Sequence, residues 1–230
     1  MRTVILCGMP EEKAVLAKAL PGILILSGTD KLNLPTLVPA DCTMIVSAGL
    51  CGGLAPGLGI GAIVLAMRLL DQAGKVDVPD PAWVMNVARA CATAGITAAQ
   101  GAYYSSGILD QADTAPQRAV MFKSTGARAI DDESRYVAAL AAQRQISFGV
   151  LRSVSDDWTE TLPLAATGAI MNKDGSANID YLLASLAKQP GQIPQLLKIA
   201  ADFKTSLDTL GAAAAACRAD FGDFLPQLAA

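Results

Sequence analysis

The segment SAGLCGGLAPGLGIGAIVLA, residues 47–66, contains six glycines, one proline and no charged residue. The uncharged stretch around it extends from Cys42 to Met67, which is longer than the roughly 20 residues that a membrane-spanning helix needs. Glycine, however, costs about 1 kcal/mol at each interior position of a helix, and Pro56 would interrupt one. The segment therefore predicts two buried strands around a tight glycine-rich turn.

Short apolar runs alternate with alanine-rich helical runs along the whole chain, which is typical of a layered α/β sheet. We expect strands at residues 3–8, 22–28, 43–49, 61–67, 101–107, 127–131 and 147–155. We expect helices at residues 10–20, 80–95 and 133–145, and a helical pattern from residue 177 to the end that is interrupted at 189–194. Neither an internal repeat nor a shift in composition marks a boundary, so residues 1–230 are expected to form one domain.

The composition excludes several classes of function. With 18 basic and 21 acidic residues and a pI near 4.9, the chain lacks the basic surface that binds nucleic acid. It has no histidine, which excludes Ser-His and Cys-His nucleophiles and nearly every usual zinc site. Its five cysteines form no C-x-x-C pair and fit reduced thiols in a cytosol. We expect a cytoplasmic protein with no metal, no cofactor and no transmembrane segment.

Polar side chains follow the expected strands, at the edge where open α/β sheets bind ligands. These positions hold Glu11 and Glu12; Ser105, Ser106 and Gly107; Asp131, Asp132 and Glu133; and Ser155, Asp156 and Asp157. Each acidic group taken alone fits the first turn of a helix, a helix cap or a turn. Together they would converge in space, where carboxylates raise one another's pKa values. The pattern predicts a site that moves protons and holds hydroxyl groups.

The glycine-rich segment matches neither common nucleotide-binding motif. No G-K-[ST] follows it, as a P-loop requires, and GLGIG at residues 57–61 is not a G-x-G-x-x-G that opens a helix. Cys51 within the segment is a poor nucleophile, because no histidine is present to activate its thiol.

Four motifs occur together in a recognisable order: GMPEE at 8–12, the glycine-rich segment, IDDES at 130–134 and RSVSD at 152–156. This series resembles the superfamily of purine nucleoside phosphorylases and nucleosidases, whose best-known small members cleave methylthioadenosine and S-adenosylhomocysteine. The resemblance covers residues 1–160 and implies a three-layer α/β/α fold with a central mixed, twisted sheet, no cofactor and a homo-oligomer. Residues 172–203 look more particularly like the hopanoid-associated branch, which processes adenosylhopane.

The resemblance also implies roles for single residues. Glu12 falls on the carboxylate that activates the attacking water, and Glu133 on the one that holds the ribose hydroxyls. Asp156, with Ser155 beside it, falls on the acid that protonates the leaving purine. The chemistry agrees, because cleavage of an N-ribosidic bond passes through an oxocarbenium-like state and needs an acid at the leaving group and a base for water.

The segment Ser47–Gly53 falls on the loop under the ribose and the nucleophile, where glycine lets the backbone approach closely. Its substrate-binding candidates are Ser47, Gly49, Cys51 and Gly52. Ile108 and Leu109, after YYSSG, fall near the loop that stacks on the base.

The sequence departs from the family pattern at two places. Asp132 stands where the family usually has methionine beside the ribose, so it either tunes an altered substrate or impairs activity. Phosphorolytic members typically hold phosphate with an arginine just ahead of the glycine loop; Ser47 stands there, and no arginine lies between Arg2 and Arg68. We therefore expect hydrolysis rather than phosphorolysis, although Lys13 or backbone amides offer an alternative way to bind phosphate.

Our leading hypothesis is an enzyme that removes adenine from a 5′-modified adenosine with a long apolar substituent, as in adenosylhopane. The apolar content of 52% fits a greasy substrate groove, and fits core packing equally well. The second hypothesis is a methylthioadenosine/S-adenosylhomocysteine nucleosidase or a purine nucleoside phosphorylase, and the third is a nucleoside-binding protein without turnover. The expected partners are a small nucleoside, phosphate in the phosphorolytic alternative and further copies of the chain. Work at a membrane surface stays open.

Overall fold

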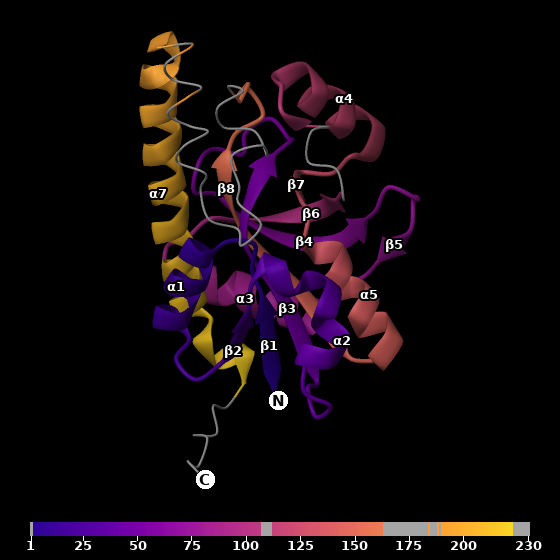
Figure 1. The fold of residues 1–230 in the computed structure, drawn as a ribbon. Helices are drawn as coiled ribbons and strands as arrows, with labels where there is room; N and C mark the ends of the chain where they lie inside the picture. Colours follow the sequence, from indigo (N-terminus) through magenta and orange to yellow (C-terminus); the bar gives the residue numbers. More distant parts are fainter. Residues whose placement is uncertain (1, 107–111, 163–183, 185–187, 189, 223–230) are drawn as a thin grey trace.

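Eight strands form one mixed sheet in the computed structural model, which describes residues 2–106, 112–162, 184, 188 and 190–222. The strands are β1 (Thr3–Leu6), β2 (Leu24–Leu26), β3 (Met44–Gly53), β4 (Ile63–Leu70), β5 (Val76–Asp77), β6 (Ala98–Ser105), β7 (Ala129–Asp131) and β8 (Ser147–Asp156). Their order is β2-β1-β3-β7-β6-β4-β5, and β8 pairs with both β3 and β4. As a result β3, β7, β6, β4 and β8 pair in a closed ring (Figure 1).

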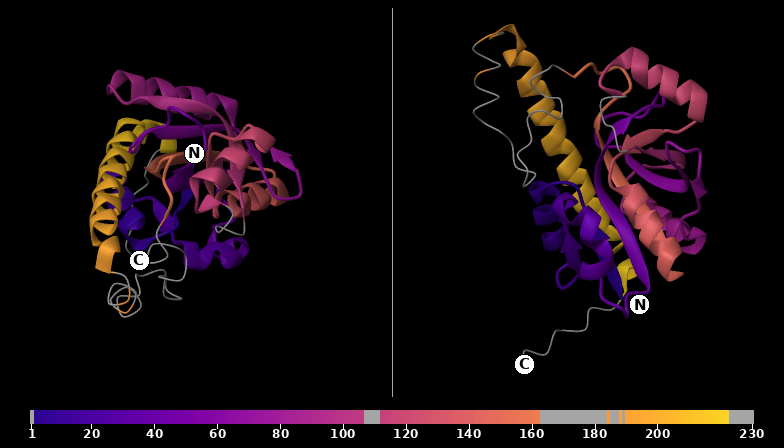
Figure 2. Two further views of the ribbon diagram at one scale, coloured as in Figure 1. Left: turned by 90° about the horizontal axis from the view of Figure 1, so that it is seen from above. Right: turned by 45° about the vertical axis from the view of Figure 1, so that its right-hand side comes forward.

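Helices cover both faces of this sheet and give the expected three layers (Figure 2). On one face α1 (Pro10–Ala19), α3 (Pro81–Thr93) and α7 (Ile193–Ala216) pack on an apolar cluster. On the other face lie α2 (Leu34–Leu37) and α5 (Ser134–Arg144), while α4 (Ala115–Thr125) packs on a smaller cluster beside the ring. Short 3-10 helices are η1 (Gly28–Asn33), η5 (Pro190–Gln192) and η6 (Arg218–Phe221).

Local sequence explains where several of these helices begin and end. Pro10 occupies the first turn of α1, and Asp80 caps α3 by accepting hydrogen bonds from the N–H groups of Ala82 and Trp83. α4 ends at Gly126, whose φ of 67° lies in the left-handed region that favours glycine.

The expected strands are all present, with one informative difference. β3 does not stop at Gly49 but continues through the glycines to Gly53, so the turn comprises residues 54–62. Glycine is tolerated in this strand because side chains of other elements occupy the space that a Cβ would fill at Gly49 and Gly52. Gly49, Gly52 and Gly53 thus lie in the sheet itself, whereas Gly57, Gly59 and Gly61 lie in the turn.

The helix α4 was not expected from the sequence, although a signal for it exists. Thr114 and Gln117 form a reciprocal capping box at its start, and Pro116 occupies its first turn. At the other end of the chain, the expected helical pattern is observed in α7 and η6; residues 163–183, 185–187, 189 and 223–230 are outside the described part. Of the helices in the described residues, none is long and apolar enough to cross a membrane.

Candidate active site

The sheet opens along one side of β3. β1 pairs with β3 as far as Ser47, and β7 begins to pair with it only at Gly52. In the gap between them, the N–H of Leu50 donates a hydrogen bond of 2.6 Å to Glu12 Oε1. A crevice where neighbouring strands diverge is the usual ligand position in an α/β sheet.

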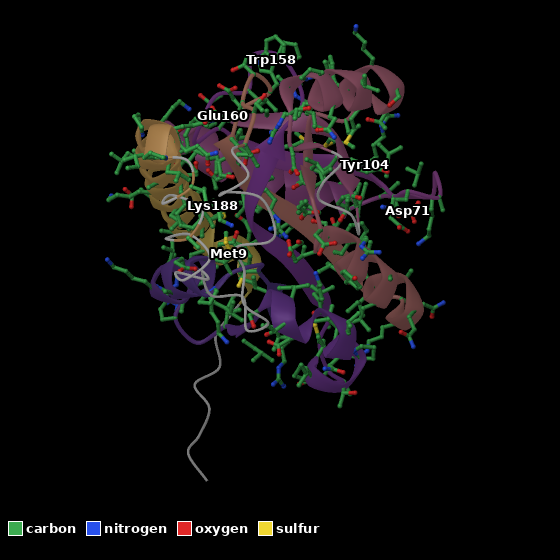
Figure 3. All side chains as sticks on the ribbon, turned by 45° about the horizontal axis from the view of Figure 1, so that its top comes forward. Met9, Asp71, Tyr104, Trp158, Glu160 and Lys188 are labelled. Carbon is green, nitrogen blue, oxygen red and sulfur yellow. The ribbon has the colours of Figure 1, made fainter. Side chains whose placement is uncertain are left out.

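Glu12 is almost completely buried at this gap, with 1% of its surface exposed. Its second carboxylate oxygen accepts hydrogen bonds from the N–H groups of Gly8 at 2.6 Å and Met9 at 2.9 Å. Met9 precedes the first turn of α1 and is labelled in Figure 3. Burial raises the pKa of Glu12, against the opposing effects of Arg152 and of the three N–H donors. A carboxylate that keeps its place and binds a proton more readily than usual is suited to act as a base.

Arg152 connects Glu12 to two further carboxylates. Its guanidinium is 1% exposed and places Nη2 2.8 Å from Asp131 Oδ2 and 3.2 Å from Glu133 Oε2. The same nitrogen donates to Ser47 Oγ at 2.6 Å. β8 and β3 run parallel with Arg152 opposite Gly49, so strand register puts the arginine beside the gap.

Glu133 is a second carboxyl group at this gap whose pKa is raised. Burial, followed by repulsion from neighbouring carboxylates, raises the pKa of Glu133 to about 7, even though Arg152 acts in the opposite direction. Glu12 and Glu133 face the same small space, because a Cβ on Gly8 would lie 3.2 Å from an oxygen of each. Glu133 therefore titrates near neutral pH next to the proposed base.

Gly49 separates Glu12 from Arg152 inside β3. A Cβ at this position would lie 2.6 Å from Arg152 Nη1 and 2.7 Å from both Glu12 oxygens. Only glycine fits here without displacing one of the two groups.

Asp156 forms a second group of contacts further along β3. Ser155 Oγ donates to its Oδ1 at 2.7 Å, and Arg118 from α4 forms an ion pair with Oδ2. A Cβ on Gly52 would lie 3.0 Å from Asp156 Oδ2 and 3.2 Å from Arg118 Nη1. Gly49 contacts one group and Gly52 the other, and the Cα atoms of these two glycines are about 10 Å apart along the strand.

Asp132 is paired with two cations, although its charge also contributes to the raised pKa of Glu133. It forms an ion pair with Lys31 of η1 and lies 3.6 Å from Arg135 Nη2. Both cations also lie over the ring of Tyr136. The carboxylate that departs from the family pattern is therefore held between two cations.

Three substrate-binding candidates from the sequence remain: Cys51, Ile108 and Leu109. Cys51 is buried, and burial raises the pKa of its thiol far above the usual range, which agrees with its exclusion as a nucleophile. Its carbonyl oxygen lies 3.3 Å from Ser155 Oγ. Ile108 and Leu109 lie outside the described residues. Within the described part of the chain, His, Cys, Asp and Glu side chains form no group that could hold a metal ion.

The structure thus brings together two sets of predicted residues: Glu12, Glu133, Ser47 and Gly49 in one, and Asp156, Ser155 and Gly52 in the other. Sequence reasoning placed Asp131 among the converging carboxylates without an individual role, and it gave no role to Arg152 or Arg118. Arg152 had a signal, since it is a single cation within the apolar run of residues 147–155. Arg118 lies on the helix that was not expected.

A family model described as the phosphorylase superfamily matches residues 28–187, more than half of the chain. Among curated proteins, none matches the chain.

Several solved structures share the fold at low sequence identity. A 5′-methylthioadenosine/S-adenosyl homocysteine nucleosidase from Campylobacter jejuni is 13% identical, with a TM-score of 0.66 over 95% of this chain and 99% of its own. The corresponding nucleosidase from Neisseria meningitidis, in complex with methylthio-immucillin-A, is 16% identical, with a TM-score of 0.64 over 96% and 98%. Futalosine hydrolase from Helicobacter pylori is 15% identical, with a TM-score of 0.62 over 92% and 96%. The motifs, the mixed sheet and the family match lead to one conclusion: the chain belongs to the phosphorylase superfamily.

Proposed function

We propose that this chain cleaves the N-ribosidic bond of a purine nucleoside and releases the base, with water as the nucleophile. The observation that carries the proposal is the placement of two carboxyl groups along β3, with Glu12 at Gly49 and Asp156 at Gly52. The two glycines are about 10 Å apart on the strand. Cleavage of a glycosidic bond uses an acid at the leaving group and a base for water, and two carboxyl groups at different positions along one strand suit that pairing.

Glu12 is the proposed base for the attacking water. Its three backbone donors leave one lone-pair position of the carboxylate for a proton from water. Its buried position gives it the higher proton affinity that this role requires. Glu133 is the proposed partner of the ribose hydroxyls, because it faces the same space at Gly8.

Asp156 is the proposed acid at the leaving purine. Its side chain retains 18% exposure, so a ligand in the crevice has access to it. Ser155 holds one oxygen of the carboxyl group, which limits its rotation. Transfer of a proton to the purine ring as the C1′–N9 bond breaks lets the base leave neutral.

The electrostatics favour water over phosphate. The two arginines that are buried in the described part of the chain, Arg118 and Arg152, already face carboxylates. A phosphate bound to either arginine would have to compete with those carboxylates and would be repelled by them. A neutral water molecule does not meet this repulsion.

The proposed substrate is a 5′-modified adenosine, and within that class an adenosine with a long apolar 5′ substituent, as in adenosylhopane. The support for this finer choice is the resemblance of residues 172–203, much of which lies outside the described residues. The alternative within the superfamily is a methylthioadenosine/S-adenosylhomocysteine nucleosidase, the activity that names several structural neighbours. A homo-oligomer and contact with a membrane surface stay predictions.

Product analysis tests the proposal. The purified full chain is incubated with 5′-methylthioadenosine, S-adenosylhomocysteine and a 5′-alkyladenosine, each with and without phosphate, and adenine and the sugar product are quantified. Hydrolysis predicts adenine with the free sugar under both conditions. A sugar 1-phosphate that forms only in the presence of phosphate would show that phosphate, and not water, is the nucleophile. Binding without any base release, measured by calorimetry, would overturn the enzymatic proposal in favour of a nucleoside-binding protein.

The variants Glu12→Gln and Asp156→Asn separate the two proposed roles. Each should lower kcat by about 10²–10⁴-fold, because each removes one proton-transfer group while keeping the size of the side chain. The controls are an unchanged circular dichroism spectrum and retained nucleoside binding. Undiminished base release by either variant would remove that residue from its role.

A further inference from the structure

We propose that Arg118 is a positioning residue that acts through Asp156: it fixes the orientation of the carboxyl group and thereby directs the proton toward the leaving base. This inference rests on the proposed function. Arg118 comes from α4, outside the four motifs that carry the family resemblance, and lies 38 positions before Asp156 in the sequence.

The contacts of Arg118 all converge on the end of β8 and β3. Its guanidinium forms an ion pair with Asp156 Oδ2 and donates to the main-chain oxygen of Asp156 at 3.2 Å. It also donates to the main-chain oxygen of Gly53 at 3.1 Å. One side chain therefore holds the carboxyl group of Asp156, its backbone and the neighbouring strand in a fixed relation.

Both oxygens of Asp156 then have a defined partner. Arg118 occupies Oδ2 and Ser155 occupies Oδ1, so rotation of the carboxyl group would break at least one of these contacts. Gly52 allows the close approach, since a Cβ there would lie 3.0 Å from Oδ2.

Stability alone gives a weak account of this arginine. Its side chain is 2% exposed, and its Nε–H is buried without a hydrogen-bond partner. Burial of such a charge costs desolvation energy that an ion pair offsets only when the remaining donors are also satisfied. The arrangement is therefore better explained by the placement of Asp156 than by a gain in folding free energy.

A double-mutant cycle tests the role. Arg118→Met removes the guanidinium but keeps the length of the side chain, and it should lower kcat for base release by about 10²-fold, with KM within about threefold of the wild type. In the Asp156→Asn background the same substitution should have no further effect on kcat, because the group that it positions is already absent. Arg118→Lys keeps the positive charge and should have a kcat at least tenfold higher than that of Arg118→Met.

Two controls keep the result interpretable. Lys123→Gln changes an exposed cation on the same helix and should leave kcat unchanged. A riboside with a 4-nitrophenyl leaving group needs no proton, so Arg118→Met should cleave it at the wild-type rate. The ratio of the cleavage rates of the purine and 4-nitrophenyl substrates is measured on one preparation, so it does not depend on the fraction of folded protein. If Arg118→Met does not fold, Arg118→Lys replaces it in the cycle, with an expected loss of about tenfold.

The outcomes that overturn the inference are distinct from failure of the proposed function. Equal losses in the wild-type and Asp156→Asn backgrounds, or equal losses for the purine and 4-nitrophenyl substrates, would show a merely structural arginine. Base release within threefold of the wild type by Arg118→Met would show no role. If the wild-type chain releases base from none of the nucleosides, the proposed function fails, and the role of Arg118 fails with it.

Discussion

The replacement Gly49→Ala tests whether the absence of a side chain at Gly49 is what allows Glu12 and Arg152 to occupy their positions beside β3. The added Cβ would lie 2.6 Å from Arg152 Nη1 and 2.7 Å from both Glu12 oxygens, whereas ordinary contact begins at 3.4 Å. Arg152 must therefore move by about 0.8 Å and Glu12 by about 0.7 Å, unless the strand itself shifts. Neither moves easily, because Glu12 is held by three backbone N–H groups and Arg152 by two carboxylates.

We expect this displacement to lower kcat by about 10²-fold, the cost of misplacing a reacting group by about 1 Å. Overpacking should also lower the free energy of unfolding by about 1–3 kcal/mol. Steady-state kinetics of adenine release and urea unfolding measure the two effects on the same protein. Because the attacking water is affected, the loss should extend to a 4-nitrophenyl riboside, unlike the loss in Arg118→Met.

Gly59→Ala is the matched control. It adds the same methyl group in the turn after β3, where no other atom lies within 4 Å of the new Cβ. It should change neither kcat nor stability measurably. If folded Gly49→Ala protein releases adenine at a rate within threefold of the wild type, then the close contact of Glu12 and Arg152 across Gly49 does not control the reaction.

Three further predictions concern titration and packing. Burial raises the pKa of Glu133 to about 7, so its carboxyl group is protonated below that pH. If Glu133 holds the ribose hydroxyls as proposed, its ionised form is the better acceptor, and KM should fall by about fivefold between pH 6 and pH 8; a KM of Glu133→Gln that still follows pH would contradict this assignment. Asp131→Asn leaves buried Arg152 with one carboxylate fewer and should cost about 3–5 kcal/mol of unfolding free energy in denaturant titrations. Asp41→Asn breaks a surface ion pair with Arg2 and should cost at most about 1 kcal/mol of unfolding free energy. Similar losses of unfolding free energy in Asp131→Asn and Asp41→Asn would contradict this expectation. Gly149→Ala places a Cβ 2.4 Å from the ring of Trp83 and should lower Tm while the kcat of the folded protein is retained.

The expected and observed positions of Asp132 lead to different views of the same substitution. From the sequence, Asp132 is an extra carboxylate beside the ribose. In the structure it pairs with Lys31, which belongs to η1 and lies 101 positions earlier in the chain. Its charge is compensated by a residue that no local motif connects to it, so impaired activity is not a necessary consequence of the departure.

Much of the fold follows from local sequence. Apolar runs such as those at 3–8 and 147–155 predict the strands, because a strand buried on both faces needs a continuous apolar segment. Glu12 lies in the first turn of the helix that follows β1, and Glu133 lies two positions after β7; these positions after strands were enough to mark both as site candidates. α4 was missed because its start signal is a single capping box at Thr114, and its sequence has no clear apolar period.

The sequence by itself determined the layered α/β architecture, the absence of histidine chemistry and the identity of the carboxyl groups at the strand ends. Only the tertiary structure decided which cation each carboxylate faces. Arg152 reaches Asp131 and Glu133, and Arg118 reaches Asp156, through strand register and helix docking that bring together segments distant in the chain. The physical reason is that these pairs depend on which strands become neighbours, and local propensity carries no information about that choice.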